Sequence, residues 1–244
     1  MIEVRALTAH ADFAEAVRLQ KQIWGFDEIE LLPVRLFVVA AKVGGQVFGA
    51  FDGGRMVGFC LSIPGLKPGG KTYLHSHMLG VVSEYRDAGV GRMLKLRQRE
   101  EAIARNIELM EWTFDPLEIK NAYFNMERLG CIVRRYVLNQ YGTTSSHLHG
   151  GLPTDRCTAE WWLRSARAEA VLGGRKMERP EIVERVAVPV NIGKLRSTNS
   201  KQAREVQQRV SDRLLDSFNR GLAVVGFDRS DDAGTYLLST WPSN

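Results

Sequence analysis

The hydrophobic and polar positions of the first 140 residues follow strand and helix periods in turn. Alternation with a period of two over 2–7 predicts a strand, and apolar residues near helical spacing over 12–24 predict a helix. Pro33 can open a second helix, which Gly44-Gly45 ends. The further expected elements are strands at 46–52, 55–63 and 72–82, a helix at 92–106, a strand at 108–114, a helix at 118–129 and a strand at 131–138. This order predicts an α/β (α+β) fold with a mixed, mostly antiparallel central sheet flanked by helices.

The last part of the chain predicts further structure. Strands are expected at about 159–164 and 183–190, a helix at about 200–220, and closing strands at 222–227 and 235–239. The helix carries an apolar stripe that must bury against something, formed by Val206, Val210, Leu214 and Phe218. We therefore expect a domain at 1–153 and a C-terminal β-α-β-β extension at 154–244, which docks on the same sheet and does not fold independently.

Composition and charge are those of an ordinary soluble protein. The chain has 244 residues, of which 44% are hydrophobic and 25% charged. Its longest apolar run is far shorter than the ~20 residues of a membrane helix, and no secretory signal starts the sequence, so a cytoplasmic protein without a membrane partner is expected. The net charge of +5 is too small to predict nucleic-acid binding but suits a phosphorylated ligand. Three scattered cysteines, Cys60, Cys131 and Cys157, are expected to be buried thiols.

A glycine-containing turn between a strand and a helix carries the strongest chemical signal. Its sequence is Arg86-Asp87-Ala88-Gly89-Val90-Gly91-Arg92. The first N–H groups of a helix have no internal partner and can bind phosphate oxygens, and glycines let a phosphate come close. Arg86 or Arg92 could add charge-assisted hydrogen bonds. A tight turn that binds nothing is the alternative.

The pattern Arg86-x-x-Gly89-x-Gly91 resembles the motif of the GNAT acyltransferase superfamily, and the order of elements over about 2–140 is similar to that fold. The resemblance implies that the loop amides hold the pyrophosphate of coenzyme A and that Val81 and Val82 pair with its pantetheine arm. A poorly characterised subgroup of predicted GNAT acetyltransferases is more similar still. The segments that carry this likeness are Trp112-Thr113-Phe114-Asp115-Pro116, Asn121-Ala122-Tyr123-Phe124-Asn125, Gly151-Leu152-Pro153-Thr154-Asp155-Arg156 and Glu160-Trp161-Trp162.

This resemblance implies an acyl-CoA-dependent N-acyltransferase that acts on a small amine or an amino acid by direct transfer. Some members of the subgroup are thought to N-succinylate amino acids, so acetyl-CoA is the first expectation for the donor and succinyl-CoA the second. A non-catalytic acyl-CoA-binding or regulatory module is the alternative from another class. A nucleic-acid binder lacks the interleaved aromatic residues that stacking needs. A homodimer is left open.

Two groups are candidates for the proton transfers that amide formation requires. His75 occupies the strand position at which the superfamily carries its base, and its class of pKa suits neutral pH. His77 shares its face and Glu84 is a rival, while hydrogen-bonded structural histidines are the plain alternative. The superfamily's acidic tyrosine position is Met126 here, so Tyr123 is the substitute, against simple packing.

The remaining candidates concern the coenzyme arm and the acceptor. Asn121 resembles an asparagine that contacts the pantetheine, with helix capping as the competing interpretation. Tyr141 opens a polar loop suited to an acceptor pocket, and Arg156 could bind a carboxylate with two hydrogen bonds. An internal ion pair of Arg156 with Asp155 or Glu160 is the alternative.

The polar loop also holds His147 and His149, which are not spaced like a metal pair with further ligands. No metal is therefore expected. Basic residues outnumber acidic ones between Arg164 and Arg204, and a solvated rim is the expected role of this segment.

Overall fold

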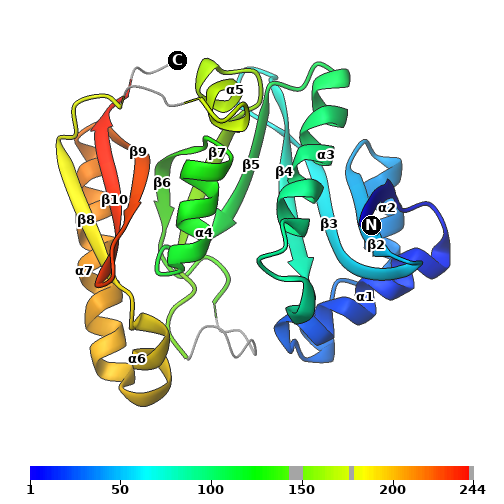
Figure 1. Ribbon diagram of the computed structural model, residues 1–244, viewed down its shortest axis with the longest axis horizontal. Coiled ribbons are helices and arrows are strands. Elements are labelled where there is room, and N and C mark those ends of the chain that lie inside the picture. Colours follow the sequence, from blue (N-terminus) through cyan, green and yellow to red (C-terminus); the bar gives the residue numbers. More distant parts are fainter. Residues whose placement is uncertain (143–150, 176–178, 242–244) are drawn as a thin grey trace. The chain divides into compact units, whose positions relative to one another are not determined.

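The computed structural model describes residues 1–142, 151–175 and 179–241, and it divides into two compact units (Figure 1). The first unit is 1–111 and the second is formed by the described residues from Trp112 onward. The division falls inside strand β5 (Leu109–Phe114), so this strand contributes to both units.

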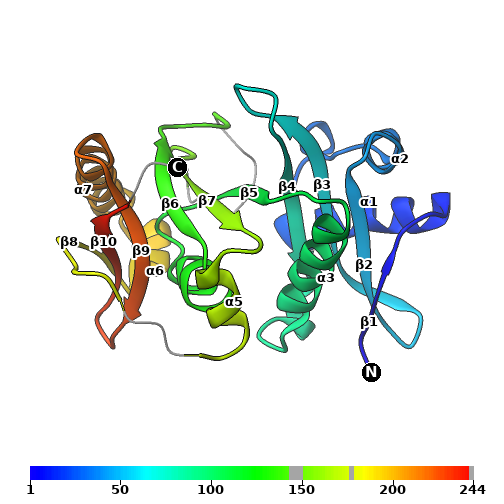
Figure 2. The ribbon, with the colours of Figure 1, turned by 90° about the horizontal axis from the view of Figure 1, so that it is seen from above.

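The first unit is a sheet covered on both faces. Its elements are β1 (Glu3–Ala6), α1 (His10–Trp24), the short turn η1 (Glu28–Glu30), α2 (Val34–Lys42), β2 (Gln46–Asp52), β3 (Arg55–Leu66), β4 (Thr72–Val81), η2 (Ser83–Tyr85), α3 (Val90–Ala104) and the start of β5. Strands β1 to β4 are antiparallel neighbours in chain order, and β5 is parallel to β4. Helices α1 and α2 lie on one face of this sheet and α3 on the other (Figure 2).

Buried apolar residues explain why these elements assemble. Phe37 of α2 and Phe59 of β3 are completely buried, with ring centroids 6.0 Å apart. Leu94 of α3 is equally buried on the other face of the sheet. Removing such side chains from water is the main driving force of folding. The expected strands and helices of this unit are all present, with ends shifted by a few residues at most.

A β-bulge interrupts the pairing of β3 with β4. Leu61 lies opposite Met78 and Ser62 opposite Ser76, which leaves His77 as an extra residue on β4. A bulge bends the strand and redirects a side chain. Ser76 faces α3, where Lys95 Nζ donates to its hydroxyl at 2.8 Å and Gln98 Oε1 accepts from it at 3.1 Å. Because strand residues alternate in facing, His75 projects from the α1 and α2 face.

The second unit is a second group of antiparallel strands with its own helices. Its elements after β5 are α4 (Ile119–Tyr123), a π-helical turn η3 (Phe124–Arg128), β6 (Ile132–Val137), β7 (Arg156–Trp162), α5 (Ala166–Leu172), β8 (Glu184–Pro189), α6 (Ile192–Thr198), α7 (Ser200–Asn219), β9 (Leu222–Arg229) and β10 (Ala233–Thr240). Strands follow the order β7-β6-β9-β10-β8, with antiparallel pairs. Helix α7 buries its apolar stripe, including Val206, Val210 and Leu214.

The C-terminal segment differs from the expected β-α-β-β order and from the expected limit at Pro153. Its described elements are β7-α5-β8-α6-α7-β9-β10, because α5 and α6 were not predicted. The limit after 153 falls inside the second unit, since β6 pairs with both β7 and β9. Residues before and after Pro153 therefore share one run of strands.

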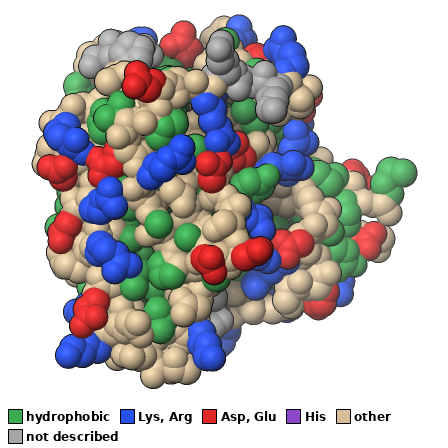
Figure 3. Space-filling view, turned by 60° about the vertical axis from the view of Figure 1, so that its left-hand side comes forward, with side chains coloured by type: hydrophobic (Ala, Val, Ile, Leu, Met, Phe, Trp, Pro, Cys, Tyr) green, Lys and Arg blue, Asp and Glu red, His purple; other side chains and the backbone are tan. Residues whose placement is uncertain are grey.

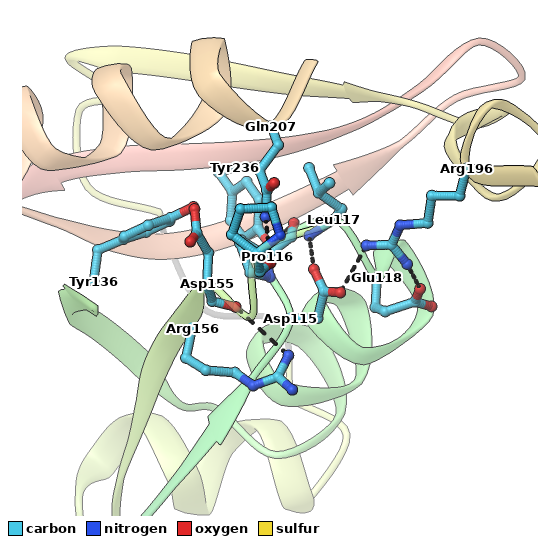
Figure 4. Close-up of polar contacts among 11 residues, drawn as sticks. Asp115, Pro116, Leu117, Glu118, Tyr136, Asp155, Arg156, Arg196, Gln207 and Tyr236 are labelled. Carbon is cyan, nitrogen blue, oxygen red and sulfur yellow. Dashed lines mark hydrogen bonds and ion pairs between the residues drawn. The ribbon is translucent and has the colours of Figure 1, made fainter. Parts of the chain in front are cut away.

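Polar contacts join distant segments of the second unit (Figure 4). Arg196 donates to Asp115 Oδ2 and to Glu118 Oε1, each at 2.6 Å. Tyr236 Oη donates to the Pro116 carbonyl at 2.6 Å. Both contacts hold the stretch between β5 and α4 against the C-terminal elements.

Trp161 is completely buried and Trp162 only partly, as expected for neighbours on opposite faces of a strand. All three cysteines are free and buried.

Basic residues of the segment between Arg164 and Arg204 form ion pairs within the second unit. Arg179 donates to Asp228 Oδ1 at 2.6 Å, and Arg196 is buried in its pair with Asp115. Acidic and basic side chains lie interspersed on the face drawn in Figure 3. The solvated rim is thus only part of the role of this segment. Among the described helices, none has the length and apolar character needed to cross a membrane.

Candidate active site

The turn between β4 and α3 presents the open end of a helix. Residues Arg86 to Gly89 are exposed, and Gly89 takes the left-handed conformation with φ of 82° directly before the helix. The N-cap of α3 is Gly89, which has no side chain to cap the helix, and the first turn holds no acidic residue. The orphan N–H groups and the helix dipole therefore face outward with a partial positive charge. This geometry fits a bound phosphate or pyrophosphate.

The residues around this turn provide a charged side chain and open space beside the helix N-terminus. Arg86 Nε donates to the Val81 carbonyl at 3.2 Å, which folds an exposed guanidinium group back along the end of β4. Val82 is buried and fixes the end of the strand. A Cβ added at Gly91 would lie 3.6 Å from Leu79 Cδ2, an ordinary contact, so the packing leaves room there for a small side chain.

The two strand histidines lie in the first unit, on β4. Their ring centroids are 6.0 Å apart, His75 is half-buried, and His77 in the bulge is exposed. Partial removal of water around the imidazole lowers the pKa of His77 below its ordinary value. A lowered value keeps an imidazole neutral at neutral pH, which is the form that accepts a proton. Glu84, the rival, accepts hydrogen bonds from its own backbone N–H and from the side chains of Ser83 and Arg55, and these lower its pKa.

An ion pair beside the histidines was not predicted from the sequence. Glu111 is 3% exposed, and Lys67 Nζ donates to both of its carboxylate oxygens, at 2.7 and 2.8 Å. The sequence feature that could have indicated this pair is Glu111 itself, a charged residue inside the otherwise apolar start of the strand Leu109–Phe114. Strand β3 extends to Leu66, three residues beyond the expected end at 63, and so brings Lys67 directly after the strand.

The two acceptor candidates, Tyr141 and Arg156, lie together in the second unit. The Arg156 guanidinium group stands over the Tyr141 ring, 5.4 Å from its centroid, and Tyr141 Oη is 2.9 Å from Thr113 Oγ1. Burial lowers the pKa of Arg156, but an arginine stays charged throughout the working pH range. Thr113 is a further candidate residue, which the sequence did not single out.

The two carboxylates expected as alternative partners of Arg156 make other contacts. Asp155 accepts hydrogen bonds from Tyr136 Oη and from the Asn139 backbone, both at 2.9 Å. Glu160 pairs with Arg134 at 2.6 Å. Arg156 itself donates to the carbonyl oxygen of Asp155 at 3.5 Å (Figure 4). His147 and His149 of the same loop lie outside the described residues.

The coenzyme-arm and acid candidates lie on α4. Asn121 is exposed inside the helix, whose N-cap is Glu118, so the capping interpretation was wrong. Tyr123 is half-buried, and Arg229 of β9 lies over its ring at 5.0 Å. Met126 is completely buried in the π-helical turn. A π turn inserts a residue into a helix and often occurs at functional sites.

Solved structures of acetyltransferases match this fold. The ribosomal-protein-S18-alanine N-acetyltransferase of Escherichia coli has 16% identity, covers 68% of this chain and 96% of its own, and gives a TM-score of 0.53. NAA60 of Arabidopsis thaliana, in complex with a bisubstrate analogue, has 15% identity, coverage of 66% and 98%, and a TM-score of 0.52. The acetyltransferase yncA of Salmonella typhimurium, with its cofactor acetyl-CoA, has 15% identity, coverage of 74% and 98%, and a TM-score of 0.53.

This chain has the GNAT acetyltransferase fold. The mixed, mostly antiparallel sheet with flanking helices is thereby confirmed. No protein-family model and no curated protein sequence matches the chain. The GNAT likeness covers nearly all of each solved structure but leaves about a quarter to a third of this chain outside the match.

Proposed function

We propose that this protein is an acyl-CoA-dependent N-acyltransferase, with acetyl-CoA as the first candidate donor and succinyl-CoA as the second. The observation that carries the proposal is the exposed turn at the N-terminus of α3, where the N-cap is the left-handed Gly89, after β4 in a GNAT fold. The amides and side chains from Arg86 to Arg92 would hold the pyrophosphate. The backbone of Val81 and Val82, and the amide of Asn121, would bind the pantetheine arm.

Direct transfer needs few groups from the chain. The bound coenzyme would supply the thioester; the amine nitrogen forms the new bond to its carbonyl carbon while the carbon–sulfur bond breaks. His75 would accept the proton that the amine loses, with His77 as the neighbouring alternative. Tyr123 would donate a proton to the leaving thiolate. Its ring lies half-buried under the guanidinium group of Arg229, 5.0 Å from the ring centroid, which holds the side chain in place.

For the acceptor we propose an amine that carries a carboxylate, such as an amino acid. Arg156, stacked on Tyr141, presents a planar charged group whose two N–H edges match a carboxylate. Tyr141 Oη and Thr113 Oγ1 offer further hydrogen bonds beside it. One matching enzyme is named for a protein alanine as its acceptor, so peptides are the competing class.

A non-catalytic acyl-CoA-binding module is the second candidate. The observation that favours it is the buried Met126 at the position of the superfamily's tyrosine. A module of this kind would bind acyl-CoA through the same loop and release no thiol.

The test is thiol release from acetyl-CoA and succinyl-CoA with a panel of amino acids, amino-acid amides and short peptides, followed by mass spectrometry of the products. We expect a new amide on an amino acid that has a free carboxylate. Thiol release at background with every acceptor, despite binding of a thioester, would establish the module. Products on peptides alone would overturn the proposed acceptor but not the activity.

A further inference from the structure

A cluster of titratable side chains surrounds His75 within the first unit. We define the His75 cluster as Lys67, Tyr73, His75 and Glu111. His75 lies opposite Glu111 in the parallel pairing of β4 with β5, and Lys67 stands over the Tyr73 ring at 4.6 Å. Tyr73 shares the face of His75, because strand residues two apart point the same way. The described pairs of β4 with β5 are those of Leu74 with Met110 and of His75 with Glu111.

Register partners of a parallel pair project from the same face, and their backbones lie about 4.8 Å apart. The Glu111 carboxylate is therefore within reach of the His75 imidazole. Glu111 is only 3% exposed, and a buried carboxylate without a cation is strongly unfavourable. Lys67, with a side chain 28% exposed, supplies that cation through two short hydrogen bonds. The pair thus keeps a negative charge beside the histidine in a place with little water.

We infer that Glu111, paired with Lys67, is a positioning residue for His75: it orients the imidazole and stabilises the imidazolium that forms when His75 takes a proton from the acceptor amine. This inference rests on the proposed function only for its catalytic consequence. The proton balance is complete, since the proton leaves the amine nitrogen and stays on the imidazole until solvent removes it. A carboxylate that orients a histidine base is a recurrent arrangement in enzymes of other folds.

The other charged or titratable groups near His75 differ in the charge that they can place beside the imidazole. Lys67 is a cation, but its ammonium group is paired with Glu111, because it donates to both carboxylate oxygens. His77 on the same strand can become a second cation. On β3 the register partner of His75 is Ile63, which carries no charge. Glu111 is thus the anion that these strands place beside His75.

The central variant is Glu111→Gln, which keeps the shape of the side chain and removes its charge. Glu108→Gln is the matched control, because Glu108 precedes the same strand and its pair with Lys71 is exposed, with a side chain 67% accessible. Each protein is followed by nitrogen-15 NMR of the imidazoles over a pH series, with His75→Gln used to assign the signal. Steady-state rates are measured with the acceptor found for the wild type.

The expected result is a titration midpoint of His75 lower by about one pH unit in Glu111→Gln, since an anion beside the imidazole favours its charged form. We expect kcat to fall about tenfold or more, with the acidic limb of the rate profile moved to lower pH and the affinity for acyl-CoA unchanged. Glu108→Gln should match the wild type. A Glu111→Gln protein with the wild-type midpoint and rate profile would overturn the inference.

Two further measurements separate the possible failures. If Glu111→Gln does not fold, the double variant Lys67→Met/Glu111→Leu replaces the pair by apolar side chains, a change that buried ion pairs often tolerate. It should show the same lowered midpoint. In the wild type, the imidazole should show a single tautomer, and a mixture of tautomers would contradict the inference. A wild type without turnover on any acceptor overturns the proposed function, while the NMR midpoint still decides the role of Glu111.

Discussion

Glu111 and Asp115 are close in the chain, on either side of the division between the units, and both are buried carboxylates paired with a distant cation. The partner of Asp115 is Arg196, which also binds Glu118, and the second oxygen of Asp115 accepts from the Leu117 backbone. These contacts join two parts of the second unit. The partner of Glu111 is Lys67, and the pair lies beside His75. A buried charge thus identifies a functional site only through what lies next to it.

The largest effect is expected from truncation after Pro153, which tests whether the second unit is one structure. Truncation removes β7 and β9, the two strands that pair with β6, and the Tyr236 hydrogen bond to Pro116. We predict an aggregated or partly unfolded protein without acyl transfer, measured by solubility, thermal melting and thiol release. A shortened protein that is soluble, melts like the full-length chain and keeps its rate would show that 154–244 is a separate appendage.

Substitution of His75, the candidate base beside the Glu111 pair, tests whether this part of the molecule serves catalysis. His75→Ala should lower kcat by about 10² to 10⁴, the range of one proton-transfer group, while affinity for CoA holds. His77→Ala serves as the matched control on the same strand and should lose less. A near wild-type rate and pH profile in His75→Ala would move the role to His77, Glu84 or water.

Substitution of Arg196, the cation paired with Asp115, tests whether that pair stabilises the second unit. Arg196→Met leaves Asp115 buried without its cation, and breaking a buried pair lowers the free energy of unfolding by about 3 to 5 kcal/mol. Arg213→Met is the control, because the Arg213 side chain is exposed and Glu184 keeps its second partner Arg220, so the loss should be about 0 to 1 kcal/mol. Denaturant unfolding measures both. Equal losses in the two variants would mean that the Asp115 pair does not hold the unit together.

A smaller effect is expected at the acceptor candidate. Arg156→Lys keeps the charge but loses the planar pair of N–H donors, so KM for a carboxylate-bearing acceptor should rise about tenfold. KM for the corresponding amino-acid amide should not change. Steady-state kinetics with the two acceptors decide this, and an equal rise for both would indicate that Arg156 acts only through packing on Tyr141.

Local patterns predicted the fold of the first unit and the turn at Gly89, because strand alternation, helical spacing and glycine position depend on neighbours in the sequence. The pairs of Lys67 with Glu111 and of Arg196 with Asp115 could not be predicted in this way. They join residues 44 and 81 positions apart, and only the strand pairing brings them together. The π turn at Phe124–Arg128 likewise has no local sequence signal, and it left the expected helix of 118–129 divided into two parts.

Calorimetry with CoA measures directly whether the turn from Arg86 to Gly91 binds the pyrophosphate of an acyl-CoA. The test variant is Gly91→Glu, because a Cβ at Gly91 makes only an ordinary contact with Leu79. Gly89→Glu is a less direct test, because Gly89 has a positive φ that strains any other residue. A carboxylate in the first turn suits the helix dipole, so Gly91→Glu should fold. We predict micromolar-range binding to the wild type and a loss of about a hundredfold in the variant, as expected when charge-assisted hydrogen bonds to phosphate are blocked. Unchanged affinity for CoA in a folded Gly91→Glu protein would contradict the account.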